Sequence, residues 1–326
     1  MPLALHQTLT AVARLQTDGE VLAKHRDYYL AIVEEDRGDW QRIETIYLQF
    51  TQSWENQLAQ AADDEMVVTL ADAIGRYQRL RGLRREELAW LSQALTVVER
   101  KQDQREIARL RNNIGLVHSA LGNKQQALAF YTQALSLRKQ VGDRSGEATT
   151  LNNIGRVYDA LGDKQQALEY YTRALPLCQQ VGDRGGEATT LNNIGGTYDA
   201  LGDKQQALAF YAQALLLRKQ VGDRHGEAIT LNNMGHIYAA LGDKQKALTY
   251  YTRALSLRKQ VGDRRGEAIT LNNIGRVYGD LGDKQRALEY YVQALPIREQ
   301  VGDRWGESTT RYNLAMVYKE IGRAHV

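Results

Sequence analysis

The residues that could carry out covalent or metal chemistry are few in this chain, and they do not cluster. Its single cysteine, Cys178, could act as a nucleophile only beside a base, and zinc would need several Cys and His ligands at close spacing. The six histidines lie apart from Cys178: His6, His25, His118, His225, His236 and His325. The chain also lacks the GxxxxGKS/T phosphate loop, the HExxH zinc motif, the GxSxG nucleophile motif and the GxGxxG dinucleotide motif. The sequence therefore predicts no catalytic site, no metal site and no bound cofactor.

Asparagine recurs at a fixed interval of forty residues in this sequence. A side-chain amide can both donate and accept hydrogen bonds, so a row of amides suits the backbone of an extended polypeptide ligand. The row consists of Asn113, Asn153, Asn193, Asn233, Asn273 and Asn313. The alternative is structural, since Asn near the start of a helix can also bond to its own backbone.

The elements that position this row are the two helices of a forty-residue unit. Five well-formed copies begin at Arg111, Leu151, Leu191, Leu231 and Leu271. In the second copy, apolar residues form two stripes at helical spacing, one made of Leu151, Ile154, Gly155 and Tyr158 and the other of Ala167, Leu168, Tyr171, Ala174 and Leu175. We therefore expect two amphipathic helices in each unit, with Gly162 ending the first and Asp163 capping the second.

Small residues on the two stripes indicate that the paired helices lie very close together. Gly155 and Ala167 occupy facing positions where a larger side chain would not fit, and Tyr158 and Tyr171 fill the remaining space. The capping-box spacing is present at Asn123, Asp163 and Asp203. One unit buries too few large apolar side chains to offset the entropy of ordering its residues, so stability must come from contacts between neighbouring units.

The composition favours an all-α protein of a reducing compartment. The chain of 326 residues contains three prolines and is rich in residues with high helix propensity. The 42 Lys and Arg nearly balance the 39 Asp and Glu and are interspersed with them, so no nucleic-acid-binding surface is expected. A lone cysteine cannot form an internal disulfide, and the N-terminal residues fit neither a secretion signal nor a membrane span. We therefore expect a cytoplasmic protein that does not bind membranes.

The positions of the small and large apolar residues resemble those that define the tetratricopeptide repeat, or TPR. The matching residues are Leu151, Ile154, Gly155, Tyr158, Gly162, Ala167, Tyr171 and Ala174. The resemblance implies an all-α, right-handed superhelical solenoid of antiparallel helix pairs, whose first helices line a concave groove that holds peptides. On this basis the chain divides into a non-repeat helical segment (1–70), a degenerate repeat (71–110), five units (111–310) and a truncated half repeat (311–326).

Two groups of TPR proteins have repeats of similar amino-acid sequence. The forty-residue unit with its GDRxGEA junction resembles the repeats of Pins-type G-protein-signalling modulators, and the LNN opening resembles kinesin light chain. The near-identical copies also resemble bacterial arrays attached to STAND signalling ATPases or CHAT domains, and the N-terminal segment is similar to helices that link such an ATPase to its repeats. Two functions follow. One is a non-catalytic scaffold that binds a peptide or protein segment on its concave face, and the other is the sensor and autoinhibitory arm of a larger ATPase or protease.

The residues that differ between copies lie on the side of the first helix opposite its apolar stripe. One column of equivalent positions holds Leu116, Arg156, Gly196, His236, Arg276 and Met316. A neighbouring column holds Ser119, Asp159, Asp199, Ala239, Gly279 and Lys319. We expect Arg156, His236 and Arg276 to form a ligand groove with the asparagine row, and the two arginines to favour acidic ligands. The alternative is drift at solvated positions.

Several residues depart from the repeat pattern. Pro176 and Pro296 fall inside second helices and predict kinks, and Cys178 replaces the Arg of the other copies and predicts a partly exposed thiol. The first and last units are atypical at Arg111, His118, Arg311 and Ala315. The final AHV leaves the pattern, so we expect a reading frame that is cut short. The last helix would then expose apolar groups among Leu314, Val317 and Tyr318 and support self-association.

Overall fold

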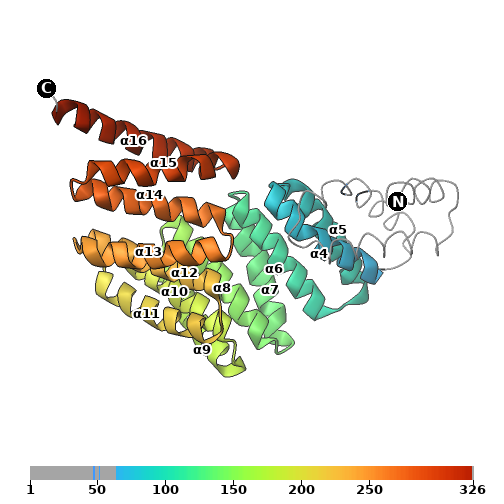
Figure 1. Ribbon diagram of the computed structural model, residues 1–326. Helices are drawn as coiled ribbons and strands as arrows, with labels where there is room; N and C mark the ends of the chain where they lie inside the picture. The colour runs from blue at the N-terminus through green and yellow to red at the C-terminus, as the bar shows by residue number, and fades with distance from the viewer. Residues whose placement is uncertain (1–46, 48–50, 52–63, 325–326) are drawn as a thin grey trace, which may run out of the picture. The chain divides into compact units, whose positions relative to one another are not determined.

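The computed structural model describes residues 47, 51 and 64–324, and all the regular structure in this part of the chain is α-helical (Figure 1). Most of the expected non-repeat segment lies outside the described residues. The helices form two compact units that divide between Gly146 and Glu147. The prediction of an all-α solenoid of antiparallel helix pairs is confirmed.

The part of the first unit that the structure describes contains two helix pairs. Its helices are α4 (Asp64–Arg81), α5 (Arg84–Lys101), α6 (Gln104–Ala120) and α7 (Lys124–Gln140). Each helix packs against the next one in the chain, and the short connections make neighbours antiparallel. Ile74, Trp90, Leu110 and Ile114 lie in one apolar cluster at the centre of this unit.

The second unit continues the same alternation of first and second helices. Its helices are α8 (Arg144–Leu161), which begins just before the division, α9 (Lys164–Val181), α10 (Arg184–Ala200), α11 (Lys204–Gln220), α12 (Arg224–Ala240), α13 (Lys244–Gln260), α14 (Arg264–Asp280), α15 (Lys284–Gln300) and α16 (Arg304–Ala324). From α9 to α16 each helix packs against the next. The even-numbered helices are the first helices of their repeats, and the odd-numbered ones are the second.

The core of the second unit is a strip of small clusters that alternate along the stack. Tyr211 of α11 packs with Met234 and Ile237 of the next first helix. Leu231 of α12 packs with Leu257 at the far end of its own second helix. Because each cluster joins only neighbouring helices, stability comes from interfaces between adjacent elements, as the sequence indicated.

The predicted close approach of paired helices is confirmed. A Cβ atom added at Gly155 would lie 2.6 Å from Cε1 of Tyr171, which is far inside van der Waals contact. The same tyrosine contact recurs at Gly115, Gly195, Gly235 and Gly275. Ala167 is fully buried, so both small residues are required by the packing.

The predicted turn between helices is also confirmed in most copies. Gly162 has φ +88°, a left-handed conformation that favours glycine. The Asp163 carboxylate then accepts a hydrogen bond from the backbone N–H of Gln166 at 3.0 Å. Asp243 caps α13 in the same way although Lys246 replaces the glutamine, so the aspartate carries the cap. Asn123 differs from the prediction because its side chain makes no capping hydrogen bond.

Two expectations about second helices have different outcomes. α9 and α15 continue past Pro176 and Pro296, so neither proline ends its helix, and a kink at each remains a prediction. The expectation of a partly exposed thiol was wrong, because Cys178 is only 1% exposed. The arginines of that column are buried too: Arg218 is 5% exposed, and its guanidinium donates to the backbone oxygen of Gly226. An arginine in this column therefore does not indicate a solvated position.

The last helix is covered on one side only. Val317 is buried against Ala287 and Tyr291 of α15, and Leu314 packs beside it. Tyr318 is 59% exposed, whereas its equivalent Tyr278 is half-buried. Of the three apolar residues expected to lack a partner, Tyr318 is therefore the most exposed.

Candidate functional site

Contacts between helices identify the inner side of the second unit (Figure 1). α10 contacts α12, α12 contacts α14 and α14 contacts α16, whereas no contact joins the described second helices α11, α13 and α15 to one another. The stack therefore curves toward its first helices. The apolar stripe of α8, which includes Leu151 and Ile154, is buried, so the exposed Arg156 and Ala160, which lie across the helix from the middle of this stripe, face the inner side. We name this exposed side of the first helices the inner face.

The asparagine row lies between neighbouring first helices. Three of its amides donate across a repeat boundary, Asn233 to Asn192, Asn273 to Asn232 and Asn313 to Asn272, with 3.2–3.4 Å between Nδ2 and Oδ1. Asn153 in α8 is buried and Asn193 in α10 is half-buried, as is Asn113 in α6 of the first unit. The bonds between repeats are a role that neither interpretation of the sequence anticipated.

A second set of residues completes this network and was missed by sequence reasoning. The Thr230 hydroxyl, fully buried, donates to Asn192 Oδ1 at 3.2 Å and accepts from Arg218 Nη1 at 2.9 Å. The same pattern joins Arg258, Thr270 and Asn232. The hydrogen bonds of Thr230 join α11 to the first helices on either side of it in the chain, α10 and α12. The only signal in the sequence was that Thr stands at this position in every copy, which apolar packing does not require.

The network differs where Cys178 replaces the arginine. Thr190 there has the Cys178 sulfur 3.9 Å away, and it accepts a hydrogen bond from Asn152 Nδ2 at 2.7 Å. The amide of Asn152 thus faces Thr190 with its nitrogen, whereas Asn192 faces Thr230 with its oxygen. Asn152 Oδ1 and Asn193 Nδ2 are both buried without a partner in the described part of the chain. The boundary beside Cys178 therefore lacks the hydrogen bond that Arg218 and Arg258 donate to the threonine in the next two repeats.

The variable column presents exposed side chains on the inner face. Arg156, His236 and Arg276 are exposed, and Gly196 is half-buried. His236 Nε2 lies 3.9 Å from Asp199 Oδ2, a weak contact at an exposed side chain. Within residues 64–324 neither Arg156 nor Arg276 forms an ion pair. Two cations on this face are therefore available to an anionic ligand.

The neighbouring column supplies carboxylates in only some repeats. Asp159 lies 2.8 Å from Lys164 Nζ and accepts from the Thr197 hydroxyl at 3.3 Å, and Asp199 pairs with Lys204. Each carboxylate also lies near the hydroxyl of a buried tyrosine. Burial raises the pKa of Tyr171 and Tyr211, and the negative charges of Asp159 and Asp199 raise it further. α12 and α14 carry Ala239 and Gly279 at these positions and so lack the carboxylate.

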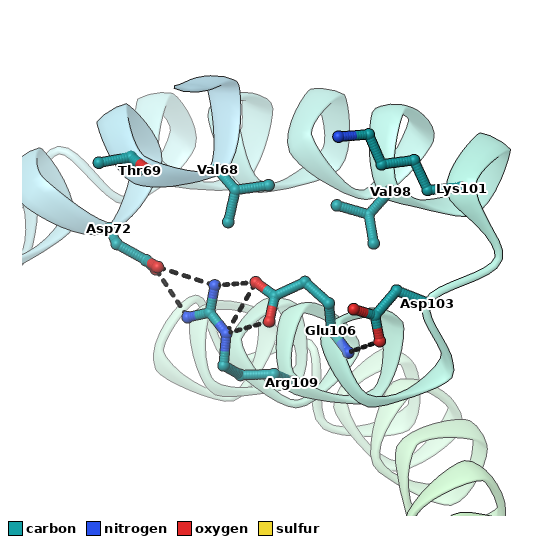
Figure 2. Close-up of a pocket in the computed structure, with 8 residues that line it drawn as sticks. All are labelled: Val68, Thr69, Asp72, Val98, Lys101, Asp103, Glu106 and Arg109. Carbon is teal, nitrogen blue, oxygen red and sulfur yellow. Dashed lines mark hydrogen bonds and ion pairs between the residues drawn. The ribbon is translucent and has the colours of Figure 1, made fainter. Parts of the chain in front are cut away.

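A pocket of about 630 Å³ in the first unit lies between α4, α5 and α6 (Figure 2). Most of its charged groups are already engaged. Arg109 reaches Asp72 at 2.7 Å and Glu106 at 2.9 Å, and Asp103 accepts from two backbone N–H groups at the start of α6. The pair of Arg109 and Asp72 joins α6 to α4, so these groups have a structural role.

The described residues offer no alternative chemistry. Within them, no group of three or more His, Cys, Asp or Glu side chains is placed to hold a metal ion. No helix in the same part of the chain is long and apolar enough to cross a bilayer. The candidate site is therefore the inner face.

The family follows from a direct match of the repeats. The tetratricopeptide repeat model matches residues 106–180, 165–220, 186–260, 226–300 and 267–325. The chain belongs to the tetratricopeptide repeat family. No curated protein matches this TPR protein in sequence.

Solved structures share the TPR fold at low sequence identity. BtubC (BKLC) from P. vanneervenii is 22% identical with a TM-score of 0.60, over 67% of this chain and 92% of that one. A STAND protein with a tetratricopeptide repeat sensor from Pyrococcus horikoshii is 15% identical with a TM-score of 0.65, over 90% of this chain and 43% of that one. A Rap protein complexed with competence and sporulation factor is 14% identical with a TM-score of 0.64, over 94% of this chain and 89% of that one. At these identities the likeness shows the fold.

Proposed function

We propose that this TPR protein is a non-catalytic scaffold that binds an extended peptide or protein segment along the inner face of its first helices. One observation carries the proposal. The framework beneath the inner face is nearly constant from repeat to repeat, whereas the exposed column above it changes from Arg156 to Gly196, His236, Arg276 and Met316. A rigid array with a different side chain in each repeat can distinguish successive parts of a ligand at little cost in ordering itself.

The solved neighbours are consistent with this proposal. A Rap protein of similar fold is seen in complex with competence and sporulation factor. In this chain, Asn153, Asn193, Asn233 and Asn273 would add amide oxygens to the groove, since in α12 and α14 the bonds between repeats use the amide nitrogens. Asn113 would play the same part in the first unit. The proposal also assigns a cytoplasmic location and no catalytic activity.

The experiment selects ligands from random sequences, so the natural partner need not be known. A phage-displayed library of random peptides is panned on the full chain, and the enriched peptides are measured by fluorescence anisotropy against two variants. The inner-face variant combines Arg156→Ala, His236→Ala and Arg276→Ala. The control variant combines Arg173→Ala and Thr249→Ala, which are exposed on second helices. We expect the inner-face variant to lose at least about tenfold in affinity. Equal loss in both variants, or no enrichment, would contradict the proposal.

The alternative role, as the sensor arm of a larger signalling ATPase, has the shared fold as its support. The gene neighbourhood tests it, because a P-loop domain joined to the same reading frame would favour it. Self-association is a separate proposal that rests on α16, where Tyr312 and Tyr318 are 64% and 59% exposed. Sedimentation of the full chain beside a Tyr312→Ser, Tyr318→Ser variant tests it, and equal monomer fractions would contradict it.

A further inference from the structure

One column of the inner face carries a carboxylate in α8 and α10 but not in α12 and α14. In the first two repeats of the second unit, the tyrosine beneath the inner face has a carboxylate beside its hydroxyl, from Asp159 or Asp199. In the next two repeats the equivalent positions are Ala239 and Gly279. Tyr251 and Tyr291 are still present and buried in these repeats, but no carboxylate stands at the position that Asp159 and Asp199 occupy in the earlier ones.

Tyr251 is left with an unused hydrogen-bonding group. The side chain is fully buried against Gly235, whose added Cβ would lie 2.8 Å from the ring. In the described part of the chain its hydroxyl has no acceptor for its proton: it makes no hydrogen bond of good geometry, and the polar group that acts on it, the Arg276 guanidinium, can only donate. Burial raises the pKa of Tyr251 to about 12, although the nearby Arg276 lowers it, so the hydroxyl is protonated and can donate. A buried donor without a partner is costly, so such groups mark places where a ligand or water completes the site.

Arg276 supplies the positive charge next to this hydroxyl. It projects from α14, which contacts α12 directly, and its charge acts on both Tyr251 and Tyr291. The nearest carboxylate along α14, Asp280, is held by Lys244 Nζ at 3.1 Å. One repeat earlier, Asp199 lies 3.9 Å from His236, the counterpart of Arg276, whereas the counterpart of Asp199 here is Ala239, which offers the arginine no carboxylate. Arg276 is exposed and free of ion pairs within residues 64–324.

We propose that Tyr251 and Arg276 form a binding subsite for a carboxylate, supplied by an Asp or Glu side chain of a peptide on the inner face. The ligand carboxylate takes the place that Asp159 and Asp199 occupy in the earlier repeats. The guanidinium gives it charge-assisted hydrogen bonds, and the tyrosine hydroxyl gives it a further donor. The subsite deepens the proposed function and rests on it for the source of the carboxylate.

The first test needs no ligand, because it supplies the carboxylate from the chain itself. Ala239→Asp places beside Tyr251 the residue type that Asp159 and Asp199 place beside Tyr171 and Tyr211, and Ala239→Asn is its uncharged control of equal size and similar helix propensity. We expect Ala239→Asp to unfold at a higher denaturant concentration than Ala239→Asn, and this difference to disappear when both carry Arg276→Gln. Equal midpoints for the Asp and Asn variants would overturn the subsite, whatever the function of the chain.

The second test uses peptides enriched on the full chain, synthesised with an amidated C-terminus and a fluorescein label. We expect replacement of one Glu or Asp by Gln or Asn to weaken binding about tenfold. The same loss should follow from Arg276→Gln or Ala239→Asp, with no further loss when peptide and protein changes are combined. Additive losses would overturn the subsite.

Two alternative ligands give different results in the same assay. If the site binds a free carboxyl terminus, amidation of the peptide abolishes binding. If it binds any small anion, inorganic phosphate displaces the peptide. Either outcome would overturn the assignment to an acidic side chain. Failure of any peptide to bind would contradict the proposed function and leave the first test to decide the subsite.

Discussion

Two adjacent glycines of α10 offer a matched test of the close packing between paired helices. A Cβ at Gly195 would lie 2.9 Å from Cδ1 and Cε1 of Tyr211 and 3.2 Å from the backbone oxygen of Ala207. A Cβ at Gly196 would meet only the Tyr211 hydroxyl, at 3.5 Å. Both glycines lie inside the same helix, so replacing either by Ala gives the same gain in helix propensity.

The two substitutions should therefore change stability in opposite directions. Ala is about 1 kcal/mol more favourable than Gly inside a helix. Overpacking against a ring and a backbone oxygen costs about 1–3 kcal/mol. Gly196→Ala should thus raise the free energy of unfolding by about 1 kcal/mol, whereas Gly195→Ala should lower it by up to about 2 kcal/mol. The difference between the variants isolates the steric cost.

Guanidinium chloride unfolding followed by circular dichroism measures both variants. Because repeat arrays can unfold in stages, hydrogen exchange of the α10 and α11 amides should accompany it and report the local free energy of opening. If Gly195→Ala were as stable as Gly196→Ala, the tyrosine ring would not lie against α10 as described. Packing would then not require glycine at Gly155 either.

Three further predictions concern single side chains. The Cys178 thiol is buried, and burial raises its pKa, so it should react with a thiol reagent far more slowly in the native protein than after denaturation. Burial lowers the pKa of His118, so the folded state binds fewer protons than the unfolded state, and stability should fall as pH drops below about 6.5. His118→Tyr, which matches the other repeats, should reduce this loss, as measured by unfolding midpoints at about pH 7.5 and about pH 5. Asp203→Ala removes a cap and should cost about 1 kcal/mol, whereas Asn123→Ala should cost less because no cap bond is lost; equal shifts in the unfolding midpoint would contradict the assignment.

The helices and their packing could be predicted from the sequence because they depend on residues that lie close together in the chain. Apolar residues at helical spacing identified the stripes, and Gly155 with Ala167 identified the face where helices meet. Gly162 identified the turn for a reason that is also local, since its positive φ excludes most other residues. None of these inferences depends on which residues far apart in the chain come together.

The candidate site was less predictable because its contacts join separate repeats. The row beginning at Asn113 was recognised, but its partners lie in a neighbouring helix, so the bond from Asn233 to Asn192 could not be read from either residue alone. Burial of Cys178 was misjudged for a related reason. Charge alone suggested that Arg218 faces water, yet the backbone oxygen of Gly226 and the hydroxyl of Thr230 allow it to be buried.

The bonds between repeats have an evolutionary consequence. They join residues at separations of 38 and 41 positions, and each partner recurs every forty residues. Removal of residues 191–230 would therefore place Asn233 opposite Asn152, with the same residue types at the new junction. Unequal recombination between copies of the gene segment could thus lengthen or shorten the array by whole repeats without a new interface. The same exchange would change which side chains are neighbours on the inner face, since this deletion removes Gly196 and places His236 in the repeat next to Arg156, so binding specificity could change faster than the fold.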